Sequence, residues 1–316
     1  MLSFKNLISS DDLNMQDIDL ILKNADSFYE IIQRDKKKVP TLRGKTIINL
    51  FFESSTRTRT SFELAAKRLS ADLINFSVST SSLKKGESII DTLKAIQAMQ
   101  VDLLVIRHSD SGALNFIAKE IPIPVINAGD GKHEHPTQAL LDLYTIKNKF
   151  SSFKGLKVAV VGDILNSRVA RSDIQLFKKM GMEVTVVSAP MLLPENTDYF
   201  SLKTFNCIDD VIEKIDILYM LRMQFERQDR KYYPSIMEYN RFLTLTSDRL
   251  KRMKEDSIVM HPGPVNRGIE ISEEVMDESS NLKDKIKINY QVAYGVAVRM
   301  ALLFLMLTKQ KEYQQI

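Results

Sequence analysis

The chain has 316 residues and a mass of 36.2 kDa, and its 44 basic and 40 acidic residues leave a net charge of +4. This balanced charge gives no indication of a nucleic-acid partner, and a hydrophobic content of 44% is typical of a globular protein. The length predicts two domains because a single core rarely grows beyond about 250–300 residues, and the single cysteine, Cys207, excludes an intramolecular disulfide and favours a reducing compartment.

An amphipathic helix is predicted near the start of the sequence. Residues 14–17, NMQD, resemble a capping box, and apolar residues then recur at helical spacing as far as Ile32. Residues 1–12 lack the basic-then-apolar pattern of a signal peptide, so we expect a cytoplasmic protein.

The most informative stretch is a buried strand that leads into a polar helix start. Residues 46–52, TIINLFF, are apolar and β-branched and predict the strand, and SSTRTRT at 54–60 precedes a helical pattern that begins at Phe62. Five hydroxyl groups and the guanidinium groups of Arg57 and Arg59 therefore meet the unpaired N–H groups at the positive end of a helix dipole. This combination predicts a phosphate site rather than a solvated basic turn.

Alternating strands and helices follow this motif. Strands at 73–78, 102–107 and 124–127 alternate with helices at 87–99 and 113–119. Such alternation predicts an α/β fold with a parallel sheet covered by helices on both faces. The polar segment STSSLKKGE, between the first of these strands and its helix, predicts a surface loop.

Two further candidate sites follow strands of this sheet. Arg107 ends the strand 102–107 at the carboxyl edge, where α/β sheets place ligands. From this residue alone, an ordinary surface charge is an equally good interpretation. In NAGDGKHEHPTQALLD at 127–142, two glycines and a proline mark a tight loop that feeds a helix, and His135 and Gln138 lie three apart at its start. The HEH triplet is a weak metal motif, and without a second cluster of ligands we expect no metal.

A second α/β domain is predicted after the polar segment KNKFSSFKG at 147–155. The buried strand 157–163, KVAVVGD, precedes neither G-x-G-x-x-G nor G-x-x-x-x-G-K-[ST], so the phosphate cradles of Rossmann and P-loop proteins are absent. A helix is expected from Leu165, with Gly181 as its stop signal. Arg168 near the start of this helix is a candidate carboxylate ligand, and a solvated charge is an equal reading.

Three further strands complete the predicted second domain, at 183–188, 216–221 and 257–260. After the second of them, side-chain alternation places Arg222 and Gln224 on the same side if the backbone is still extended. The alternative to a binding role is a surface salt bridge with Glu226. The third strand runs into the rigid loop HPGPVNRG, in which backbone carbonyls can be fixed acceptors for an –NH2 group.

The last predicted element is a helix at 291–307. It is apolar nearly all round, so we expect a buried helix. Arg299 interrupts the apolar run, which is shorter than the ~20 residues that a membrane span needs, so no membrane partner is expected.

Seven of these stretches, in the same order, resemble the sequence motifs of the transcarbamoylase family. They are STRT at 55–58, SSLKKGE at 81–87, RH at 107–108, HPTQ at 135–138, SRVA at 167–170, YMLRMQFER at 219–227 and HPGP at 261–264. The resemblance covers essentially the whole chain, and Ser54, where relatives often carry Pro or Ala, departs from the pattern beside the first motif. Within the family, the lysine loop at 81–87, the Arg–Gln pair and HPGP resemble the aspartate-specific branch.

The resemblance implies a complete set of substrate contacts. Those to carbamoyl phosphate are Arg57, Thr58, Arg107, His135, Gln138, Gly263 and Pro264. Those to aspartate are Lys85, Arg168, Arg222 and Gln224. Thr58, Arg107 and His135 are the candidates for the catalytic role, which is to polarise the carbamoyl oxygen. In the family the loop of Lys85, with Ser81 or Ser82 as its serine, reaches into the neighbouring subunit, so the resemblance implies a homotrimer with shared active sites and is compatible with regulatory chains in a larger assembly.

The implied reaction transfers the carbamoyl group of carbamoyl phosphate to L-aspartate and yields N-carbamoyl-L-aspartate and phosphate, an early step of pyrimidine (UMP) biosynthesis. The resemblance implies no metal and no organic cofactor. It also implies that the final helix packs on the first domain. We therefore expect a carbamoyl phosphate-binding domain at 1–150 plus 288–316 and an aspartate-binding domain at 151–287.

Three alternatives are weaker. The ornithine branch of the family shares the phosphate motif and HPTQ, but it would be expected to carry HCLP at 261–264 and it lacks the lysine loop. A nucleotide-binding dehydrogenase is disfavoured by the missing glycine fingerprint. A noncatalytic member that only binds ligands or partner chains is disfavoured by the presence of the full set of motifs.

Overall fold

The computed structural model describes residues 2–77, 88–194, 202–224, 236–277 and 281–308. The chain forms two compact units, of which the first consists of Met1–Tyr144 with Ala293–Ile316 and the second of Thr145–Val292. The dividing points lie inside α5 (Pro136–Lys147) and α10 (Ile288–Leu307), so each of these helices contributes to both units. The domain boundaries expected from the sequence, after residues 150 and 287, lie just outside the same two helices.

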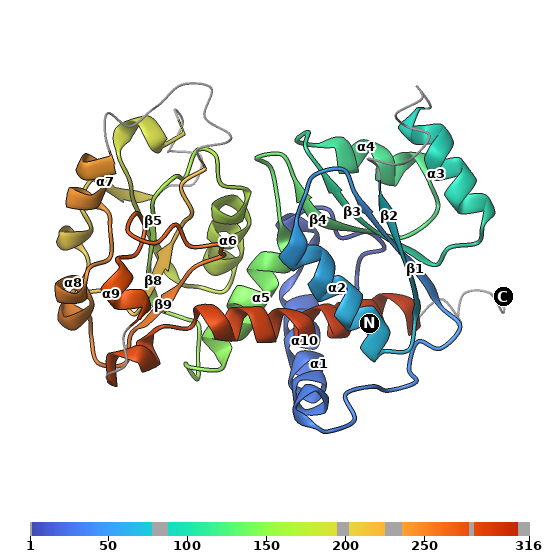
Figure 1. Ribbon diagram of the computed structural model, residues 1–316, viewed down its shortest axis with the longest axis horizontal. Coiled ribbons are helices and arrows are strands. Elements are labelled where there is room, and N and C mark those ends of the chain that lie inside the picture. Colours follow the sequence, from blue (N-terminus) through green and yellow to red (C-terminus); the bar gives the residue numbers. More distant parts are fainter. Residues whose placement is uncertain (1, 78–87, 195–201, 225–235, 278–280, 309–316) are drawn as a thin grey trace. The chain divides into compact units, whose positions relative to one another are not determined.

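The first unit is built on a four-stranded parallel sheet (Figure 1). Its strands in spatial order are β2 (Asp72–Ser77), β1 (Thr46–Phe51), β3 (Leu103–His108) and β4 (Val125–Asp130). The register sets Phe51 of β1 opposite both Ser77 of β2 and Arg107 of β3. The carboxyl ends of β1 and β3 therefore coincide, which brings the loop after β1 next to Arg107.

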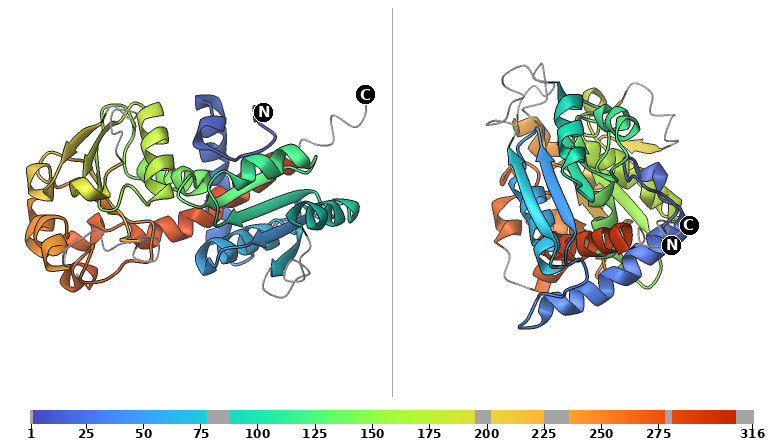
Figure 2. Two further views of the ribbon diagram at one scale, coloured as in Figure 1. Left: turned by 90° about the horizontal axis from the view of Figure 1, so that it is seen from above. Right: turned by 90° about the vertical axis from the view of Figure 1, so that its right-hand side faces the viewer.

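Helices cover both faces of this sheet (Figure 2). The helical segments of the unit are the short 3-10 turn Ser10–Asp12, α1 (Met15–Gln33), α2 (Thr56–Arg68), α3 (Ile89–Ala98), α4 (Ala113–Glu120), the first part of α5 and most of α10. On one face, Leu93 of α3 and Leu114 of α4 join a buried cluster with Ile48 of β1 and Ile106 of β3. Side chains alternate along a strand, so Ile47 faces the other side of the sheet. Helix α2 packs against β1 and β2.

Helix α10 lies in the core of the first unit for most of its length. Phe304 contacts Phe28 of α1 and Tyr294 contacts Tyr144 of α5, with ring centroids 5.6 and 5.1 Å apart. Within the described ranges it is the one helix long and apolar enough to pass as a membrane span, and most of it is buried in the protein, as in the core helix of a soluble fold. The prediction of a buried helix is therefore confirmed for most of α10, and near its start Val292 is 55% exposed.

The second unit contains a five-stranded parallel sheet. Its strands in spatial order are β7 (Lys203–Phe205), β6 (Glu183–Val187), β5 (Lys157–Val161), β8 (Ile217–Met220) and β9 (Ile258–Met260). The edge strand β7 has only three residues, too few for a recognisable alternation, and the sequence did not predict it. The predicted α/β class, with parallel sheets covered by helices, is confirmed in both units.

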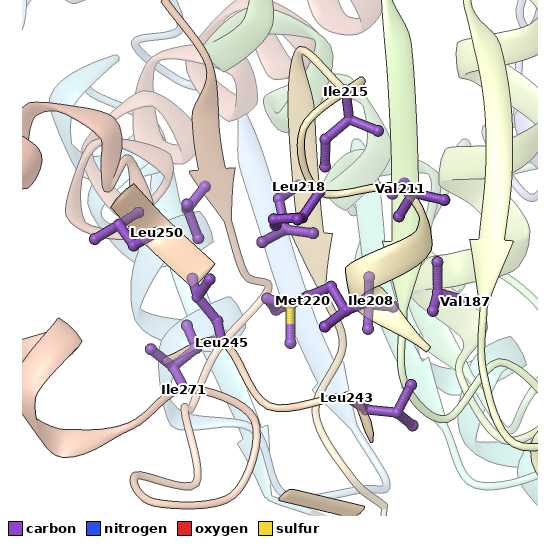
Figure 3. Packing of buried hydrophobic residues seen from close by; sticks show 14 of the residues in the cluster. Val187, Ile208, Val211, Ile215, Leu218, Met220, Leu243, Leu245, Leu250 and Ile271 are labelled. Atoms are coloured by element: carbon purple, nitrogen blue, oxygen red, sulfur yellow. The ribbon is translucent and has the colours of Figure 1, made fainter. Parts of the chain in front are cut away.

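Helices and short turns enclose this second sheet. They are α6 (Arg168–Lys179), α7 (Ile236–Phe242), α8 (Ser247–Arg252), α9 (Glu273–Met276) and 3-10 turns at Pro190–Leu192, Ile208–Asp210 and Asn281–Lys285. In one buried cluster Leu218 and Met220 of β8 pack with Ile208, Leu245 and Ile271 (Figure 3). Since Leu245 and Ile271 lie outside the strands, this cluster also fixes the loops that surround the carboxyl ends of β8 and β9.

Helix α6 begins later than predicted. The expected start was Leu165, whereas the helix begins at Arg168 with Ser167 as its N-cap, whose hydroxyl accepts a backbone hydrogen bond of 3.1 Å from the first turn. Just before it, Asp163 accepts hydrogen bonds of 2.9–3.2 Å from the backbone and the side chain of Asn166. These side-chain bonds hold the backbone in a turn and so delay the helix.

Candidate active site

The turn from β1 into α2 carries the predicted phosphate motif. Ser55 is the N-cap of α2, its backbone is extended with φ −158° and ψ 94°, and its side chain makes no capping hydrogen bond. The N–H groups of the first helical turn are therefore not taken by the cap side chain, and they form the positive end of the helix dipole. Arg57 is exposed on this turn and Thr58 is buried. The turn thus supplies the donors and the positive charge that an anion requires.

Arg107 is held at the carboxyl end of β3. Its Nη1 donates a hydrogen bond of 3.1 Å to the carbonyl oxygen of Ala128, and its Nη2 lies 3.4 Å from Oε1 of Glu53. These contacts come from β4 and from the loop after β1, so they fix the buried guanidinium where the two strands end. A guanidinium fixed in this way suits the binding of a phosphate or carbonyl oxygen.

His135 and Gln138 lie at the start of α5, and both side chains are buried. The Nδ1 atom of His135 is 3.4 Å from the hydroxyl of Thr137, and Nε2 of Gln138 donates to the two oxygens of Asp142 at 3.3 and 3.1 Å. Because the amide nitrogen of Gln138 is directed at Asp142, its amide oxygen is the atom that can accept a hydrogen bond from a ligand. This arrangement suits a ligand that carries an –NH2 group.

A buried carboxylate, Asp130, organises the loop that leads to His135. It accepts hydrogen bonds from Nδ2 of Asn127 at 2.9 Å and from the backbone of Gly112 at 2.8 Å, and it lies 3.0 Å from Nδ1 of His133. Burial alone would raise the pKa of Asp130, but hydrogen bonds from His133, Asn127 and Gly112 outweigh burial and hold this pKa below its ordinary value. Asp130 could not be recognised from the sequence, because an acidic residue in a glycine-containing loop has no pattern of its own.

The three residues of the HEH triplet have separate partners. His133 faces Asp130, and the carboxylate of Glu134 accepts a hydrogen bond of 2.9 Å from the hydroxyl of Ser10. Of the three, His135 immediately precedes α5, and its backbone carbonyl accepts a hydrogen bond of 2.9 Å from the backbone of Gln138. The triplet therefore acts as a structural turn that presents His135.

A buried arginine that the sequence analysis did not assign to the site packs behind α2 and α5. Arg299 of α10 donates from Nη1 to the hydroxyl of Ser61 at 2.8 Å, and its guanidinium carbon lies 5.0 Å from the ring centre of Phe62. Burial lowers the pKa of Arg299 to about 10, against partial opposition from the nearby carboxylate of Asp142. Since Asp142 also accepts hydrogen bonds from Gln138, Arg299 supports elements that carry two parts of the candidate site.

In the second unit the candidate residues follow three adjacent strands, β5, β8 and β9. Arg168 is the first residue of α6 and its side chain is buried. Beyond β8, the half-buried Arg222 and Gln224 alternate with the buried Leu221 and Met223. This alternation of burial is the pattern of an extended chain, in which Arg222 and Gln224 share one side.

The HPGP loop follows β9. Nδ1 of the buried His261 accepts a hydrogen bond of 2.7 Å from the backbone of Gly263, and the backbone N–H of His261 donates to Oε1 of Gln291 at 2.9 Å. Gly263 has a φ of 64°, in the left-handed region that favours glycine. The histidine ring and this backbone conformation together set the direction of the loop.

Each unit places one group of candidate residues at the carboxyl ends of adjacent strands, where α/β sheets bind ligands. In the first unit this group, after β1, β3 and β4, comprises Arg57, Thr58, Arg107, His135 and Gln138. In the second unit the group, after β5, β8 and β9, comprises Arg168, Arg222, Gln224, Gly263 and Pro264. Lys85, Ser81 and Ser82 lie outside the described residues.

Protein-family models match both halves of the chain. Residues 5–148 match the carbamoyl-P binding domain of aspartate/ornithine carbamoyltransferase, and residues 154–306 match the Asp/Orn binding domain of the same enzymes. The chain belongs to the aspartate/ornithine carbamoyltransferase family. The transcarbamoylase resemblance of the seven motifs is thereby confirmed.

Similar members of the aspartate/ornithine carbamoyltransferase family include curated proteins and solved structures. The aspartate carbamoyltransferase catalytic subunit of Syntrophotalea carbinolica is 52% identical over 301 residues, which cover 95% of each chain. That of Desulfitobacterium hafniense is 50% identical over 305 residues, which cover 96% of each chain. Aspartate transcarbamoylase from Trypanosoma cruzi, solved with N-(phosphonacetyl)-L-aspartic acid (PALA), has a TM-score of 0.86 at 31% identity over 96% of both chains. The catalytic subunit of M. jannaschii aspartate transcarbamoylase has a TM-score of 0.83 at 34% identity over 98% of this chain and 99% of its own.

Proposed function

We propose that this protein transfers the carbamoyl group of carbamoyl phosphate to the α-amine of L-aspartate, giving N-carbamoyl-L-aspartate and phosphate. This is the aspartate carbamoyltransferase reaction, an early step of de novo pyrimidine (UMP) biosynthesis. The observation that carries the proposal is the presence of two groups of residues on the family's motif positions, one suited to phosphate and one to carboxylates. Further support comes from relatives at 50–52% identity that are named aspartate carbamoyltransferase catalytic subunit, and from the Trypanosoma cruzi enzyme solved with carbamoyl phosphate and aspartate.

The residues of the first unit suit carbamoyl phosphate. Arg57 and the N–H groups of the first turn of α2 bind the phosphate, while Thr58, Arg107 and His135 direct their donors at the carbamoyl oxygen. By analogy with oxyanion-hole donors, each of these groups lowers the barrier by about 3–4 kcal/mol. The amide oxygen of Gln138 accepts a hydrogen bond from the carbamoyl –NH2 group, because its nitrogen is already directed at Asp142.

The reaction needs no covalent enzyme intermediate, since phosphate is already a good leaving group. The aspartate nitrogen attacks the carbamoyl carbon, the bond from that carbon to the bridging oxygen breaks, and the proton of the amine passes to the departing phosphate. The protein therefore has to hold two anions in position and to stabilise the oxyanion that forms between them. Neither a metal nor an organic cofactor takes part in this scheme.

The residues of the second unit suit an amine with two carboxylates. Arg168 and Arg222 can each hold a carboxylate through two parallel hydrogen bonds, and Gln224 adds a polar contact on the side of Arg222. The carbonyls of Gly263 and Pro264 serve as acceptors for the carbamoyl –NH2 group. Ornithine would instead bring a second ammonium group toward these cations, and both repulsion and an unpaired guanidinium disfavour it.

We further propose that the protein is a cytoplasmic homotrimer in which Lys85 completes the active site of the neighbouring subunit. The match of residues 81–87 to the family's lysine loop supports this assembly, with Ser81 or Ser82 as the serine of the loop. The relatives are named catalytic subunits, which is compatible with regulatory chains in a larger assembly.

A coupled assay of phosphate release tests the function. The purified protein is given carbamoyl phosphate with aspartate, with ornithine, or without an amine. We expect release with aspartate only, and inhibition of that release by PALA, which combines a phosphonate with an aspartate group. Faster release with ornithine would move the protein to the ornithine branch of the family. Binding of carbamoyl phosphate without turnover of either amine would make it a noncatalytic member.

A further inference from the structure

We propose that Glu270 is a positioning residue for the amine substrate, because its carboxylate holds the backbone of the segment that carries Arg222 and Gln224 together with the loop after β9. The inference rests on the proposed function, since the substrate concerned is aspartate. Glu270 acts through the N–H groups of Met223 and Asn266, and its own carboxylate has no exposed surface with which to touch a ligand.

The carboxylate of Glu270 is fully buried and is held by N–H groups alone. Its Oε1 accepts hydrogen bonds from the backbone of Met223 at 2.8 Å and from Nδ2 of Asn266 at 2.7 Å, and its Oε2 accepts one from the backbone of Asn266 at 2.6 Å. Among the residues that the structure describes, no Lys or Arg forms an ion pair with Glu270. A buried carboxylate is costly unless its oxygens are satisfied, so these three bonds determine where it lies.

The three bonds join two segments that are distant in the sequence. Met223 lies in the extended segment after β8, and Asn266 lies in the loop after β9. Nδ2 of Asn266 also donates to the carbonyl oxygen of Met223 at 3.4 Å, so both backbone polar groups of Met223 are tied to Asn266 and Glu270. The side chain of Met223 is buried, and its neighbours Arg222 and Gln224 therefore point to the other side. Fixing the backbone of Met223 fixes the direction of both predicted aspartate contacts.

The same carboxylate faces the HPGP loop. Nδ1 of His261 accepts a hydrogen bond from the backbone of Gly263, so the ring proton is on Nε2, which lies 3.7 Å from Oε2 of Glu270. The negative charge of Glu270 favours this tautomer, which the N–H group of Gly263 requires. One carboxylate thus aligns the segment that contacts the carboxylates of aspartate with the loop whose carbonyls are assigned to the carbamoyl –NH2 group.

The variant Glu270→Gln has nearly the same shape and tests the role of the second oxygen. The glutamine has a single acceptor oxygen for the three N–H donors, and its –NH2 group faces one of these donors. The segment at 222–224 therefore has to shift. We expect the KM for aspartate to rise at least about tenfold, which corresponds to about 1.4 kcal/mol, with a smaller fall in kcat. The variant Glu270→Asp keeps both oxygens, and we expect it to recover part of the affinity for aspartate.

Titration calorimetry can detect a selective loss of affinity for one ligand, which a purely structural role of Glu270 would not cause. PALA and inorganic phosphate are titrated separately into the wild-type protein, Glu270→Gln and the control Glu274→Gln, which removes the same charge from an exposed residue of α9. We expect the affinity of Glu270→Gln for PALA to fall at least about tenfold while its affinity for phosphate stays within about twofold of wild type. Equal losses for the two ligands, or a lower Tm with an unchanged KM for aspartate, would overturn the proposal.

A second variant keeps the test decisive if Glu270→Gln does not fold. Asn266→Ala removes the Nδ2 bonds to Glu270 and Met223 but leaves the carboxylate and its backbone bonds. It should raise the KM for aspartate in the same direction by a smaller factor, and an unchanged KM would count against the inference. A wild-type protein that neither binds PALA nor carbamoylates aspartate refutes the proposed function. If wild type does both and Glu270→Gln matches Glu274→Gln, only the role of Glu270 fails.

Discussion

The guanidinium of Arg299 donates a hydrogen bond of 2.8 Å to the hydroxyl of Ser61, which lies 238 residues earlier in the chain. This bond joins α10 to α2, whose first turn carries Arg57. The same guanidinium interacts electrostatically with Asp142, the hydrogen-bond partner of Gln138. One buried cation therefore supports two helices whose first turns hold parts of the proposed phosphate and carbamoyl site.

Replacing this cation should destabilise the fold. We expect Arg299→Met to lower the free energy of unfolding by about 1–3 kcal/mol, because Ser61 loses its charged donor and the buried Asp142 loses a nearby positive charge. Ser61→Ala removes only the neutral partner and should cost about 1 kcal/mol. Urea unfolding followed by circular dichroism measures both. Equal stability of Arg299→Met and wild type would show that Asp142 does not depend on the arginine.

The phosphate site is tested by Arg57→Ala. Arg57 is exposed on the first turn of α2 rather than packed in the core, so its loss should leave the fold and the Tm unchanged. Binding of carbamoyl phosphate, measured by isothermal titration, should be lost. Arg43→Ala removes the same charge from an exposed residue of the first unit outside the motif and serves as the control. A folded Arg57→Ala protein with near-normal affinity would refute the assignment.

The aspartate contacts are tested by Arg222→Ala. Loss of a guanidinium that pairs with a carboxylate should cost about 2 kcal/mol or more, and thus raise the KM for aspartate by roughly 30-fold. Binding of carbamoyl phosphate should be largely kept, because its phosphate contacts lie in the first unit. Arg241→Ala, an exposed arginine of the second unit, is the matched control. A parallel loss of affinity for both substrates would point to a general disturbance instead.

The shared active site is tested by mixing two inactive variants. Lys85→Ala and Arg57→Ala homotrimers should each be nearly inactive. After dissociation and reassociation in equal amounts, about one quarter of the interfaces should receive neither defect, and activity should return in proportion. Absence of recovery in a mixed trimer verified by mass spectrometry would mean that each site is built from a single chain.

The pH dependence of stability tests the role of Asp130. Its pKa is held below the ordinary value of 3.8 in the folded protein, so it contributes stability that is fully present above 3.8 and is lost as the pH falls through the lower folded pKa. The difference in unfolding free energy between wild type and Asp130→Asn should therefore be largest near neutral pH and shrink below 3.8. Asp35→Asn, at an exposed position, should show no such trend. A difference that is constant across this range would contradict the account.

The candidate site residues that the sequence suggests share a local signal. Arg107 is the last but one residue of β3 and His135 precedes α5, so each stands near a boundary that hydrophobic periodicity reveals. Asp130, Glu270 and Arg299 carry no such signal, because their roles depend on partners brought close only by the tertiary fold. Glu270 bonds to a backbone group 47 residues away, and Arg299, read from the sequence alone, is an interruption of an apolar helix.

Some elements of the fold were missed for the same physical reason. The three-residue strand β7 is too short to show alternation, and it is defined by its pairing with β6. The start of α6 at Arg168 depends on side-chain bonds from Asp163 and Ser167 that compete with the helix. The long, strongly periodic helices and the buried strands of both sheets were predictable because their own sequence dictates them.

The placement of α10 has a consequence for how the chain is made. In the first unit Phe28, near the start of the chain, contacts Phe304, near its end, and the whole second unit is synthesised between them. At a translation rate of about 5–20 residues per second, the apolar faces of α1 and α2 stay exposed for on the order of 10 s before α10, which covers them, is synthesised. Chaperones can bind these faces during that time. A ribosome halted just before Ala293 would hold a chain in which every residue of the second unit has been synthesised, while the first unit still lacks its part of α10.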